Sequence, residues 1–259
     1  MACVVRMRTL INIMIGKNDY STAAYKPSKL FKRAGGQVLP EPISTSNSGA
    51  IQIAVEKLKK GEVIAIPTDT VYGLACNAND PEAIRHLYRI KGRSDLKPVA
   101  ICVATIKDLR YWGVTDHLSD SLLNDLLPGA VTIVVKRSLH LNNPMLNPEE
   151  TNIGIRITKN PFIQDVCKLF KLPIALTSAN KSASKSTLEV YEFEELWPQL
   201  GAVFNGGHLG LSEEQRAAST VIDLSTPEYY KIIRYGVSVE AIIKTVEKHN
   251  IRLAAQSDF

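Results

Sequence analysis

A short apolar run that ends at a proline is the feature that most constrains the fold of this chain. Residues 63–66 read Val-Ile-Ala-Ile, and Pro67-Thr68-Asp69-Thr70 follows directly. The run predicts a buried strand, which the proline ends because its ring removes a backbone donor. In open α/β sheets, ligands commonly bind where strands end. We therefore interpret residues 61–97 as half of a nucleotide site around which the chain is organised.

Helical and strand patterns alternate along the rest of the chain. Helical spacing of apolar residues predicts helices over 50–60, 81–91, 105–112, 119–127, 161–170, 189–196 and 239–249. Apolar runs predict strands over 63–66, 98–103, 130–135, 153–157, 173–176, 202–204, 219–224 and 230–234. The run 130–135 is β-branched and alternates poorly, as in a strand covered on both faces. This order predicts an α/β fold in which helices cover a mixed sheet.

The first 45 residues differ in composition from the predicted domain that follows. Basic residues dominate them, and Asp19 is the only acidic residue before Glu41. An arginine-bearing, acid-poor leader is typical of a mitochondrial transit peptide, and a disordered tail is the alternative. We expect the folded domain to span residues 46–250 and a C-terminal tail to span 251–259.

Charge and cysteine usage narrow the classes of protein. The formal charge of +5 and the isoelectric point near 8.9 suit an anionic ligand such as ATP or RNA, although a solvated basic surface explains them equally. No apolar run approaches the roughly 18 residues that a membrane helix needs. The four cysteines form no Cys-x-x-Cys pair, and Cys76 and Cys102 are predicted to be buried free thiols, as in a reducing compartment. We expect a cytoplasmic protein, with mitochondria as a second location if the leader is a transit peptide.

The five histidines are scattered without the short spacing of zinc ligands, so no protein-built metal site is predicted. Hydroxyl side chains follow or begin three predicted strands: Thr68 and Thr70, Thr177 and Ser178, and Ser219. Hydroxyls and free backbone N–H groups bind phosphates and carboxylates at low steric cost, but turn and cap residues look the same.

A basic cluster stands beside the first of these loops. Lys91, Arg93 and Lys97 follow the predicted helix 81–91. The helix dipole explains a lysine at the helix end but not the whole cluster. Neither G-x-x-x-x-G-K-[ST] nor G-x-G-x-x-G occurs, which disfavours P-loop and dinucleotide sites. The residues by themselves predict a basic, hydroxyl-lined anion site in an α/β domain.

Five motifs in chain order carry a resemblance to a known family. They are PTDTVYGL at 67–74, KGR at 91–93, SAN at 178–180, STV at 219–221 and IIR at 232–234. In this order they resemble the YrdC family of threonylcarbamoyl-AMP synthases, in the short form without the extra C-terminal domain. The resemblance covers roughly residues 46–246. It implies a twisted mixed sheet flanked by helices, with a basic concave face, and makes 46–250 a catalytic domain.

The resemblance also implies a reaction and partners. The family are nucleotidyltransferases that join L-threonine, bicarbonate and ATP into threonylcarbamoyl-AMP and release pyrophosphate, the first step of N6-threonylcarbamoyladenosine formation in tRNA. Mg²⁺ would be held mainly by the phosphates and water, and a separate threonylcarbamoyl transferase complex would use the product. A non-catalytic RNA-binding module with the same basic surface, binding RNA weakly, is the alternative. Carbamoyl transfer from carbamoyl phosphate is a third hypothesis.

The matching motifs assign site residues by resemblance. The catalytic set is Lys91, Arg93, Ser178 and Asn180. The ATP-binding set is Arg93, Lys97, Ser178, Asn180, Ser186 and Arg234. The threonine-binding set is Thr68, Tyr72, Arg156 and Ser219. The loop after Asn180 departs from the family, because Ala183 follows Ser182 where the family commonly has glycine.

Overall fold

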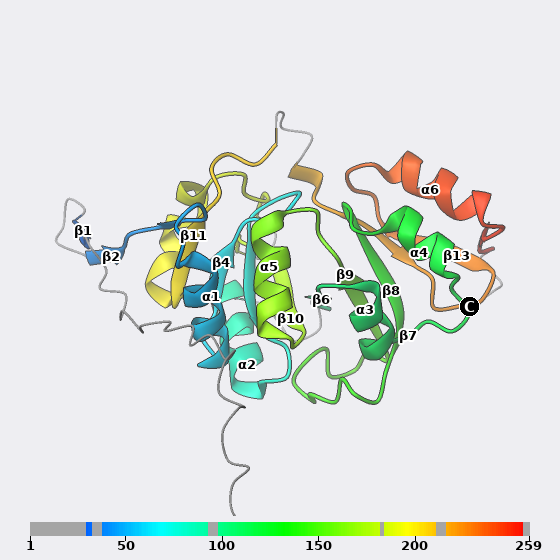
Figure 1. Ribbon diagram of the computed structural model, residues 1–259, viewed down its shortest axis with the longest axis horizontal. Helices are drawn as coiled ribbons and strands as arrows, with labels where there is room; N and C mark the ends of the chain where they lie inside the picture. Colours follow the sequence, from blue (N-terminus) through cyan, green and yellow to red (C-terminus); the bar gives the residue numbers. More distant parts are fainter. Residues whose placement is uncertain (1–29, 33–37, 93–97, 182–183, 211–215, 256–259) are drawn as a thin grey trace, which may run out of the picture.

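The apolar run before Pro67 forms strand β4 (Ile64–Ile66), which lies inside a mixed sheet. The computed structural model describes residues 30–32, 38–92, 98–181, 184–210 and 216–255, and within them this sheet has 12 strands. β4 is buried along its length and pairs antiparallel with β5 (Gly73–Asn77) and parallel with β11 (Ala202–Asn205). The loop 67–72 therefore joins two neighbouring strands inside the sheet (Figure 1).

The sheet contains both parallel and antiparallel pairs, as the alternating patterns predict. Outward from β5, its further strands in spatial order are β10 (Ile174–Ser178), β6 (Ala100–Cys102), β9 (Asn152–Arg156), β8 (Val131–Arg137), β12 (Thr220–Asp223), β13 (Tyr229–Arg234) and β14 (Arg252–Leu253). At the other edge, β3 (Ile43–Ser44) pairs with β11. Off this order of strands, β7 (Gly113–Val114) pairs with β8. A separate pair is formed by β1 (Leu30–Lys32) and β2 (Val38–Pro40). β3 and β14 lie outside the range 46–250 and still join this sheet.

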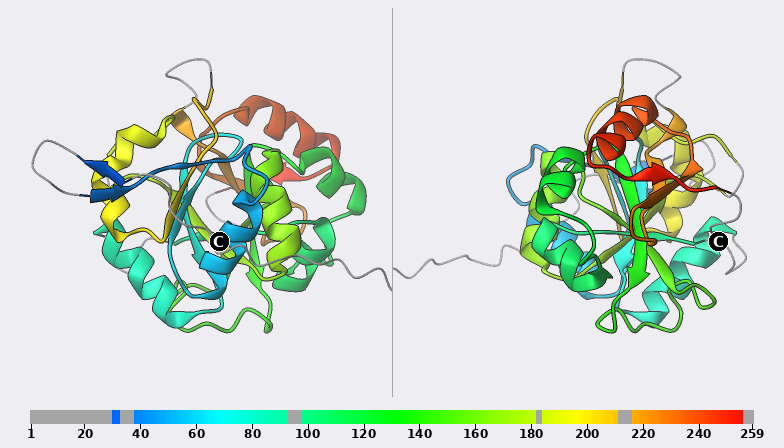
Figure 2. Two further views of the ribbon diagram at one scale, coloured as in Figure 1. Left: turned by 60° about the vertical axis from the view of Figure 1, so that its left-hand side comes forward. Right: turned by 90° about the vertical axis from the view of Figure 1, so that its right-hand side faces the viewer.

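Helices cover both faces of the sheet. The helices are α1 (Ala50–Lys59), α2 (Pro81–Lys91), α3 (Ile106–Trp112), α4 (Asp120–Leu126), α5 (Pro161–Phe170), α6 (Val239–Lys248) and the 3₁₀ helix η1 (Val190–Gln199). Two views show α1, α3, α4 and α5 on one side, and α2 with the yellow η1 on the other (Figures 1 and 2). The fold is therefore the helix-covered mixed sheet that the sequence predicts.

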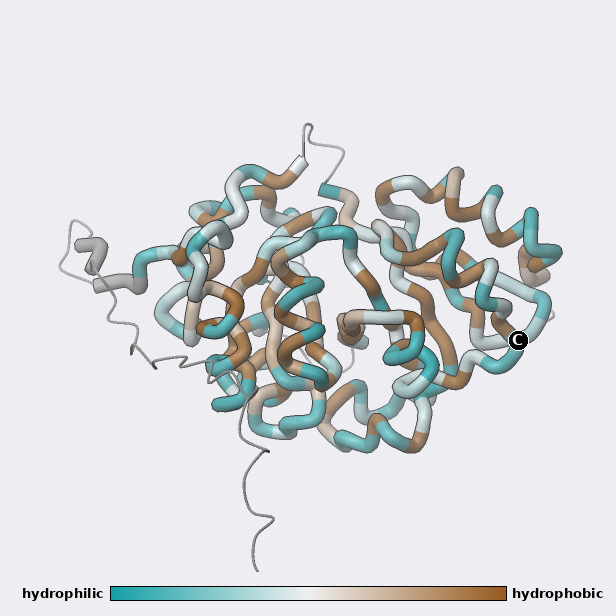
Figure 3. Tube along the Cα trace, viewed as in Figure 1, coloured by the Kyte–Doolittle hydropathy of each residue, from teal (hydrophilic) through white to brown (hydrophobic). Residues whose placement is uncertain are grey.

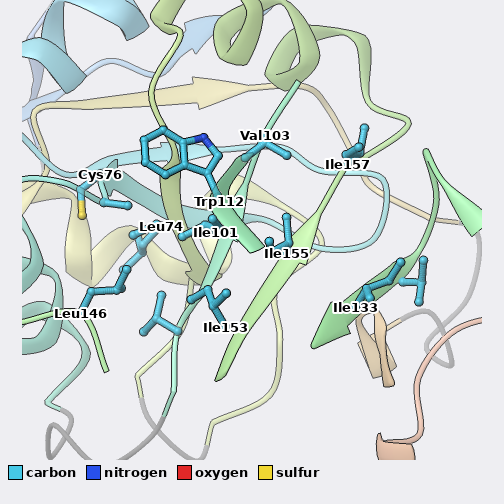
Figure 4. Packing of buried hydrophobic residues seen from close by; sticks show 14 of the residues in the cluster. Leu74, Cys76, Ile101, Val103, Trp112, Ile133, Leu146, Ile153, Ile155 and Ile157 are labelled. Carbon is cyan, nitrogen blue, oxygen red and sulfur yellow. The ribbon is translucent and has the colours of Figure 1, made fainter. Parts of the chain in front are cut away.

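Two buried clusters hold these layers together. In the smaller one, α1 and α5 pack on β4, β10 and β11 through side chains such as Leu58, Ile163 and Phe204. In the larger one, Ile133, Ile155 and Trp112 belong to a continuous set that reaches from β8 and β9 to α3 (Figure 4). Full burial of one such side chain stabilises the fold by about 1.5–3 kcal/mol. Hydrophobic residues recur along the strands and on part of each helix, as this layering requires (Figure 3).

Capping residues set the ends of α2. The Asp80 carboxylate accepts from the backbone N–H groups of Glu82 (2.9 Å) and Ala83 (3.2 Å), and Pro81 occupies the first turn. Gly92 ends the helix with φ of 56°, a left-handed conformation that glycine adopts without strain. These contacts fix where α2 ends, and therefore where Lys91 lies.

Three sequence expectations require correction. Strand β5 is missing from the predicted strands, because its small residues follow Tyr72 without a β-branched run. The predicted helix 189–196 is a 3₁₀ helix with a kink at Phe193 (φ −128°) and Pro198 inside it. β8 is covered by the core on only one face, through Ile133 and Val135, because its other face lines a cavity.

Cys76, Cys102 and Cys167 are free and buried, which confirms the expectation for the first two. In the described parts of the chain, no helix is both long and apolar enough to cross a membrane.

Candidate active site

A cavity of about 830 Å³ opens on the face of the sheet opposite the Ile133 core. Side chains alternate along a strand, so every second residue of neighbouring strands reaches it. Thr132 and Val134 of β8 line it together with Gly154 and Arg156 of β9. The loop 67–72, the end of β10 and the start of β12 complete its walls. The cavity therefore brings together the three hydroxyl-bearing segments found in the sequence.

The arginine cluster, which we define as Asp69, Thr70 and Arg156, reaches the cavity through Arg156. Arg156 is only 7% exposed. Its Nη2 donates to Asp69 Oδ1 at 2.7 Å and to Thr70 Oγ1 at 3.3 Å. Asp69 Oδ2 accepts from the backbone N–H of Lys159 at 2.8 Å. A buried guanidinium is thus held by a carboxylate from the loop that follows β4.

Thr68 and Tyr72 shape that loop. Thr68 Oγ1 donates to the Val71 carbonyl at 2.7 Å and accepts from the Thr70 N–H at 3.1 Å. The Tyr72 hydroxyl donates to the Gly207 carbonyl at 2.6 Å and accepts from the Gly206 N–H at 2.9 Å. Burial raises the pKa of Tyr72, so its hydroxyl stays protonated at neutral pH. Both residues line the cavity, and these hydrogen bonds anchor the loop.

Ser219, just before β12, also lines the cavity and is 1% exposed. Its hydroxyl and that of Thr132 are 2.9 Å apart. Arg234 Nη2 donates to the Ser219 carbonyl at 2.8 Å and to its Oγ at 3.1 Å. The backbone of Gly236 passes so close that an added Cβ would lie 2.4 Å from the Ser219 carbonyl carbon. The resemblance assigns Arg234 to ATP binding and Ser219 to threonine binding. In the structure, Arg234 contacts Ser219 directly.

The lysine bridge, which we define as Lys91, Ser178 and Asn180, reaches the cavity through Ser178. Lys91 is 3% exposed, and its Nζ donates to the Ser178 carbonyl at 2.7 Å and to Asn180 Oδ1 at 3.1 Å. It also contacts the Asn180 carbonyl, and Ser178 Oγ donates to Asn180 Oδ1. The structure therefore brings three of the four predicted catalytic residues into one hydrogen-bonded unit. Of these three, Ser178 lines the cavity.

The other nucleotide-assigned residues are placed differently. Arg93 and Lys97 lie outside the described residues. Ser186 is not part of the described cavity lining, and its carbonyl accepts from Arg216 Nη1 at 2.8 Å. Arg216 also pairs with Glu192 at 2.7 Å, and this guanidinium lowers the pKa of Glu192 to about 2.

The charges on the described cavity lining are mixed. Arg156 and Arg234 are basic, whereas Glu150 and Asp223 are acidic. A basic concave face therefore stays a prediction, because Arg93 and Lys97 are not described. Among the described residues, no group of three or more His, Cys, Asp or Glu side chains could hold a metal ion.

The sequence patterns missed two polar residues of the site. Asp69 stands inside a motif, but its partner Arg156 is 87 residues away. Thr132 meets Ser219 because β8 and β12 pair in parallel, with Val131 opposite Thr220. Strand register brings Thr132 to Ser219, whereas the packing of the loop 67–72 against β9 brings Asp69 to Arg156. The hydroxyl of Thr132 within a buried apolar strand was the one available signal.

Fold and site together define an α/β protein with a polar cavity on a mixed sheet, suited to a small ligand that carries a carboxylate or phosphate. The chain belongs to the Sua5_yciO_yrdC family, because that family model, described as "Telomere recombination", matches residues 56–236.

Named relatives agree with this assignment. The chain is 45% identical over 227 residues to threonylcarbamoyl-AMP synthase of Homo sapiens, covering 85% of this chain and 80% of that protein. It is 45% identical over 205 residues to the Bos taurus protein of the same name, covering 78% and 73%.

Solved structures share the fold. P. abyssi Sua5 complexed with L-threonine has a TM-score of 0.72 at 26% identity, covering 82% of this chain and 62% of that one. E. coli YciO has a TM-score of 0.66 at 27% identity, covering 75% and 94%. The chain thus spans less than two thirds of the P. abyssi protein.

Proposed function

We infer that this protein is a threonylcarbamoyl-AMP synthase, an enzyme that transfers a group using ATP. The observation that carries this is the 45% identity to the human synthase over 85% of the chain. The site agrees with it, since a buried arginine and several hydroxyls face one cavity. A guanidinium binds carboxylates, and L-threonine supplies one.

The reaction that these groups can support needs little covalent chemistry from the protein. The unprotonated threonine amine and bicarbonate form a carbamate and water. A carbamate oxygen then attacks the α-phosphorus of ATP, and pyrophosphate leaves. Positioning and neutralisation of charge supply most of the catalysis in such a transfer. A site of arginine, lysine and hydroxyls without an evident general base is consistent with this chemistry.

Each side of the cavity has a proposed task. Arg156 holds the threonine carboxylate, with Thr68, Tyr72 and Ser219 around the amino acid. Ser178 and Asn180, held by Lys91, present donors to the phosphates, and Arg93, Lys97, Ser186 and Arg234 belong to the same nucleotide side. The hydrogen bonds from Lys91 to Ser178 and Asn180 support a role in shaping residues 178–180.

Magnesium fits this site as an ion carried by the nucleotide. The described residues form no cluster of three or more metal-binding side chains, and Mg²⁺ usually keeps water and phosphate oxygens as ligands. When bound, it would neutralise charge on the phosphates.

A pyrophosphate-release assay tests the proposal. Release should require L-threonine, bicarbonate and ATP together, and a Lys91→Ala, Arg93→Ala double variant should lose it. Normal turnover by that variant would contradict the assignment. Activity without ATP would favour carbamoyl transfer from carbamoyl phosphate. The non-catalytic RNA-binding alternative is not favoured, because the relatives carry the name of the synthase.

Amino-acid selection gives a second readout. A pocket that hydrogen-bonds the threonine hydroxyl should reject valine by about ten-thousandfold, whereas serine, which lacks one methyl, should be rejected by roughly 10- to 200-fold. Equal use of valine and serine would contradict a hydroxyl-binding pocket.

The product is a reactive mixed anhydride, so we propose that a separate threonylcarbamoyl transferase complex consumes it to modify tRNA. Weak direct binding of RNA to the enzyme is part of this proposal and is testable with unmodified tRNA. We also propose a cytoplasmic location, with mitochondria as a second one. The mass of the mature N-terminus in purified mitochondria would show whether residues 1–45 are removed there.

A further inference from the structure

Arg156 keeps donor capacity that the described residues do not use. A guanidinium has five N–H donors, and two contacts of its Nη2 are made to Asp69 and Thr70. Its Nε is buried, and the described residues supply no acceptor for it. A buried donor without a partner is costly, and in a cavity wall it indicates a missing acceptor. A ligand carboxylate is the chemistry that matches.

Asp69 uses one oxygen to hold this arginine and the other to hold the backbone that follows β9. Oδ1 accepts from Arg156 Nη2 at 2.7 Å, and Oδ2 accepts from the Lys159 N–H at 2.8 Å. The Asp69 side chain is 10% exposed and that of Arg156 is 8% exposed. Lys159 follows Arg156 closely along the chain, so Asp69 fixes both the guanidinium and the backbone beyond β9.

We propose that Asp69 is the positioning residue for substrate carboxylate recognition, acting through Arg156. This rests on the proposed function, in which Arg156 holds the threonine carboxylate. Asp69 holds the Nη2 side of the guanidinium, while the remaining donors are kept for the substrate. It does not touch the substrate itself.

A competing electrostatic effect makes the proposal falsifiable. Asp69 is negative, so as a simple charge it would repel the substrate carboxylate, and Asp69→Asn would tighten threonine binding. As a positioning group it needs two acceptor oxygens, and asparagine offers one. Asp69→Asn must therefore lose the contact with Arg156 or the one with Lys159. Asp69→Glu keeps the charge and displaces the carboxylate by one methylene.

The experiment measures binding and turnover of both variants with the full chain. Each variant should raise the KM for L-threonine by about 10- to 100-fold, the loss expected for a misplaced charge-assisted hydrogen bond. The KM for ATP should stay within about twofold of wild type, because the lysine bridge is not touched. Asp165→Asn is the matched control, since Asp165 forms an exposed pair with Lys168 on α5.

Threoninol, in which an alcohol replaces the carboxylate, separates positioning from general damage. Wild type should bind L-threonine more tightly than threoninol, and Asp69→Asn should lose that preference while its threoninol affinity stays unchanged. A parallel fall for both ligands would show a merely structural role and overturn the proposal. So would tighter L-threonine binding by Asp69→Asn, or a wild-type KM in both variants. Absence of threonine-dependent pyrophosphate release in wild type would instead refute the proposed function.

Discussion

The arginine cluster and the lysine bridge both bury a cation beside the same cavity, but they use it differently. Arg156 is held by Asp69 and Thr70 and still has a buried Nε without a protein acceptor among the described residues. Lys91 directs one ammonium, with three donors, at four oxygen atoms of Ser178 and Asn180. An arginine fork can thus serve protein and ligand together, whereas this lysine is engaged by the protein. The comparison supports the proposal that Arg156 recognises the ligand, and it favours a loop-shaping role for Lys91.

Removing the lysine charge should have the largest effect. Lys91→Met removes the ammonium donor to the carbonyls of Ser178 and Asn180; the Ser178 carbonyl keeps the Asn180 N–H, and a buried acceptor left without a donor costs about 1–3 kcal/mol. Residues 178–180 then lose their conformation, and we expect kcat/KM to fall by about 1,000-fold with a lower urea midpoint.

Lys59→Met is the matched control, because Lys59 lies in the last turn of α1 and is exposed. If Lys91→Met lost activity with unchanged stability, Lys91 would act on the substrate directly, and the division between the two regions would be wrong.

A methyl group at Gly236 should damage the threonine side selectively. Its Cβ would lie 2.4 Å from the Ser219 carbonyl carbon and 2.5 Å from the Thr220 nitrogen, so the backbone must shift. Overpacking of this kind costs about 1–3 kcal/mol. We expect Gly236→Ala to raise the KM for threonine more than that for ATP.

Gly49→Ala serves as its control, because the new Cβ would meet only Asn47 Oδ1 at 3.6 Å. Equal changes in both KM values for Gly236→Ala would show that Ser219 contributes to both substrate sites.

Substitution of Arg234, which contacts Ser219, should have a smaller effect and should show whether this contact serves threonine, ATP or both. Arg234 is exposed and donates to Ser219 through Nε at 3.1 Å and Nη2 at 2.8 Å. Arg234→Gln keeps some hydrogen-bonding capacity, and we expect both KM values to rise by about 3- to 10-fold, since exposed charged contacts contribute little. Steady-state titration of each substrate checks this, with Arg85→Gln as an exposed-pair control. A change in the KM for ATP alone would show that Arg234 does not contribute to threonine binding.

Much of the fold followed from local patterns because local contacts produce it. Asp80, Pro81 and Gly92 set the ends of α2 by hydrogen bonds and backbone preference within a few residues. β5 escaped prediction because its position depends on pairing with both β4 and β10, which the local sequence does not encode. The kink of η1 depends similarly on how Phe193 packs in the core.

The site was less accessible to sequence reasoning than the fold. Charge and hydroxyl patterns found Lys91, Ser178 and Ser219, and the family resemblance added Arg156. Neither predicted that Asp69 holds Arg156 or that Thr132 meets Ser219, since each contact joins residues 87 positions apart. Loop packing against β9 decides the first contact, and strand register decides the second.

The smallest predicted effect concerns the pair between Glu192 and Arg216, which ties the Ser186 loop to η1. Arg216 lowers the pKa of Glu192 from its ordinary value of 4.5 to about 2. A carboxyl with a lowered folded-state pKa stabilises the protein above its ordinary value, and this contribution is lost as pH falls toward 2. The pair is partly exposed, so solvent screening limits it to about 0.5–1 kcal/mol. Glu192→Gln should therefore lower the urea midpoint at pH 7, and its difference from wild type should shrink as the pH falls from 4.5 through about 2. A difference that persisted unchanged at low pH would show that packing, and not the charge of Glu192, anchors this loop.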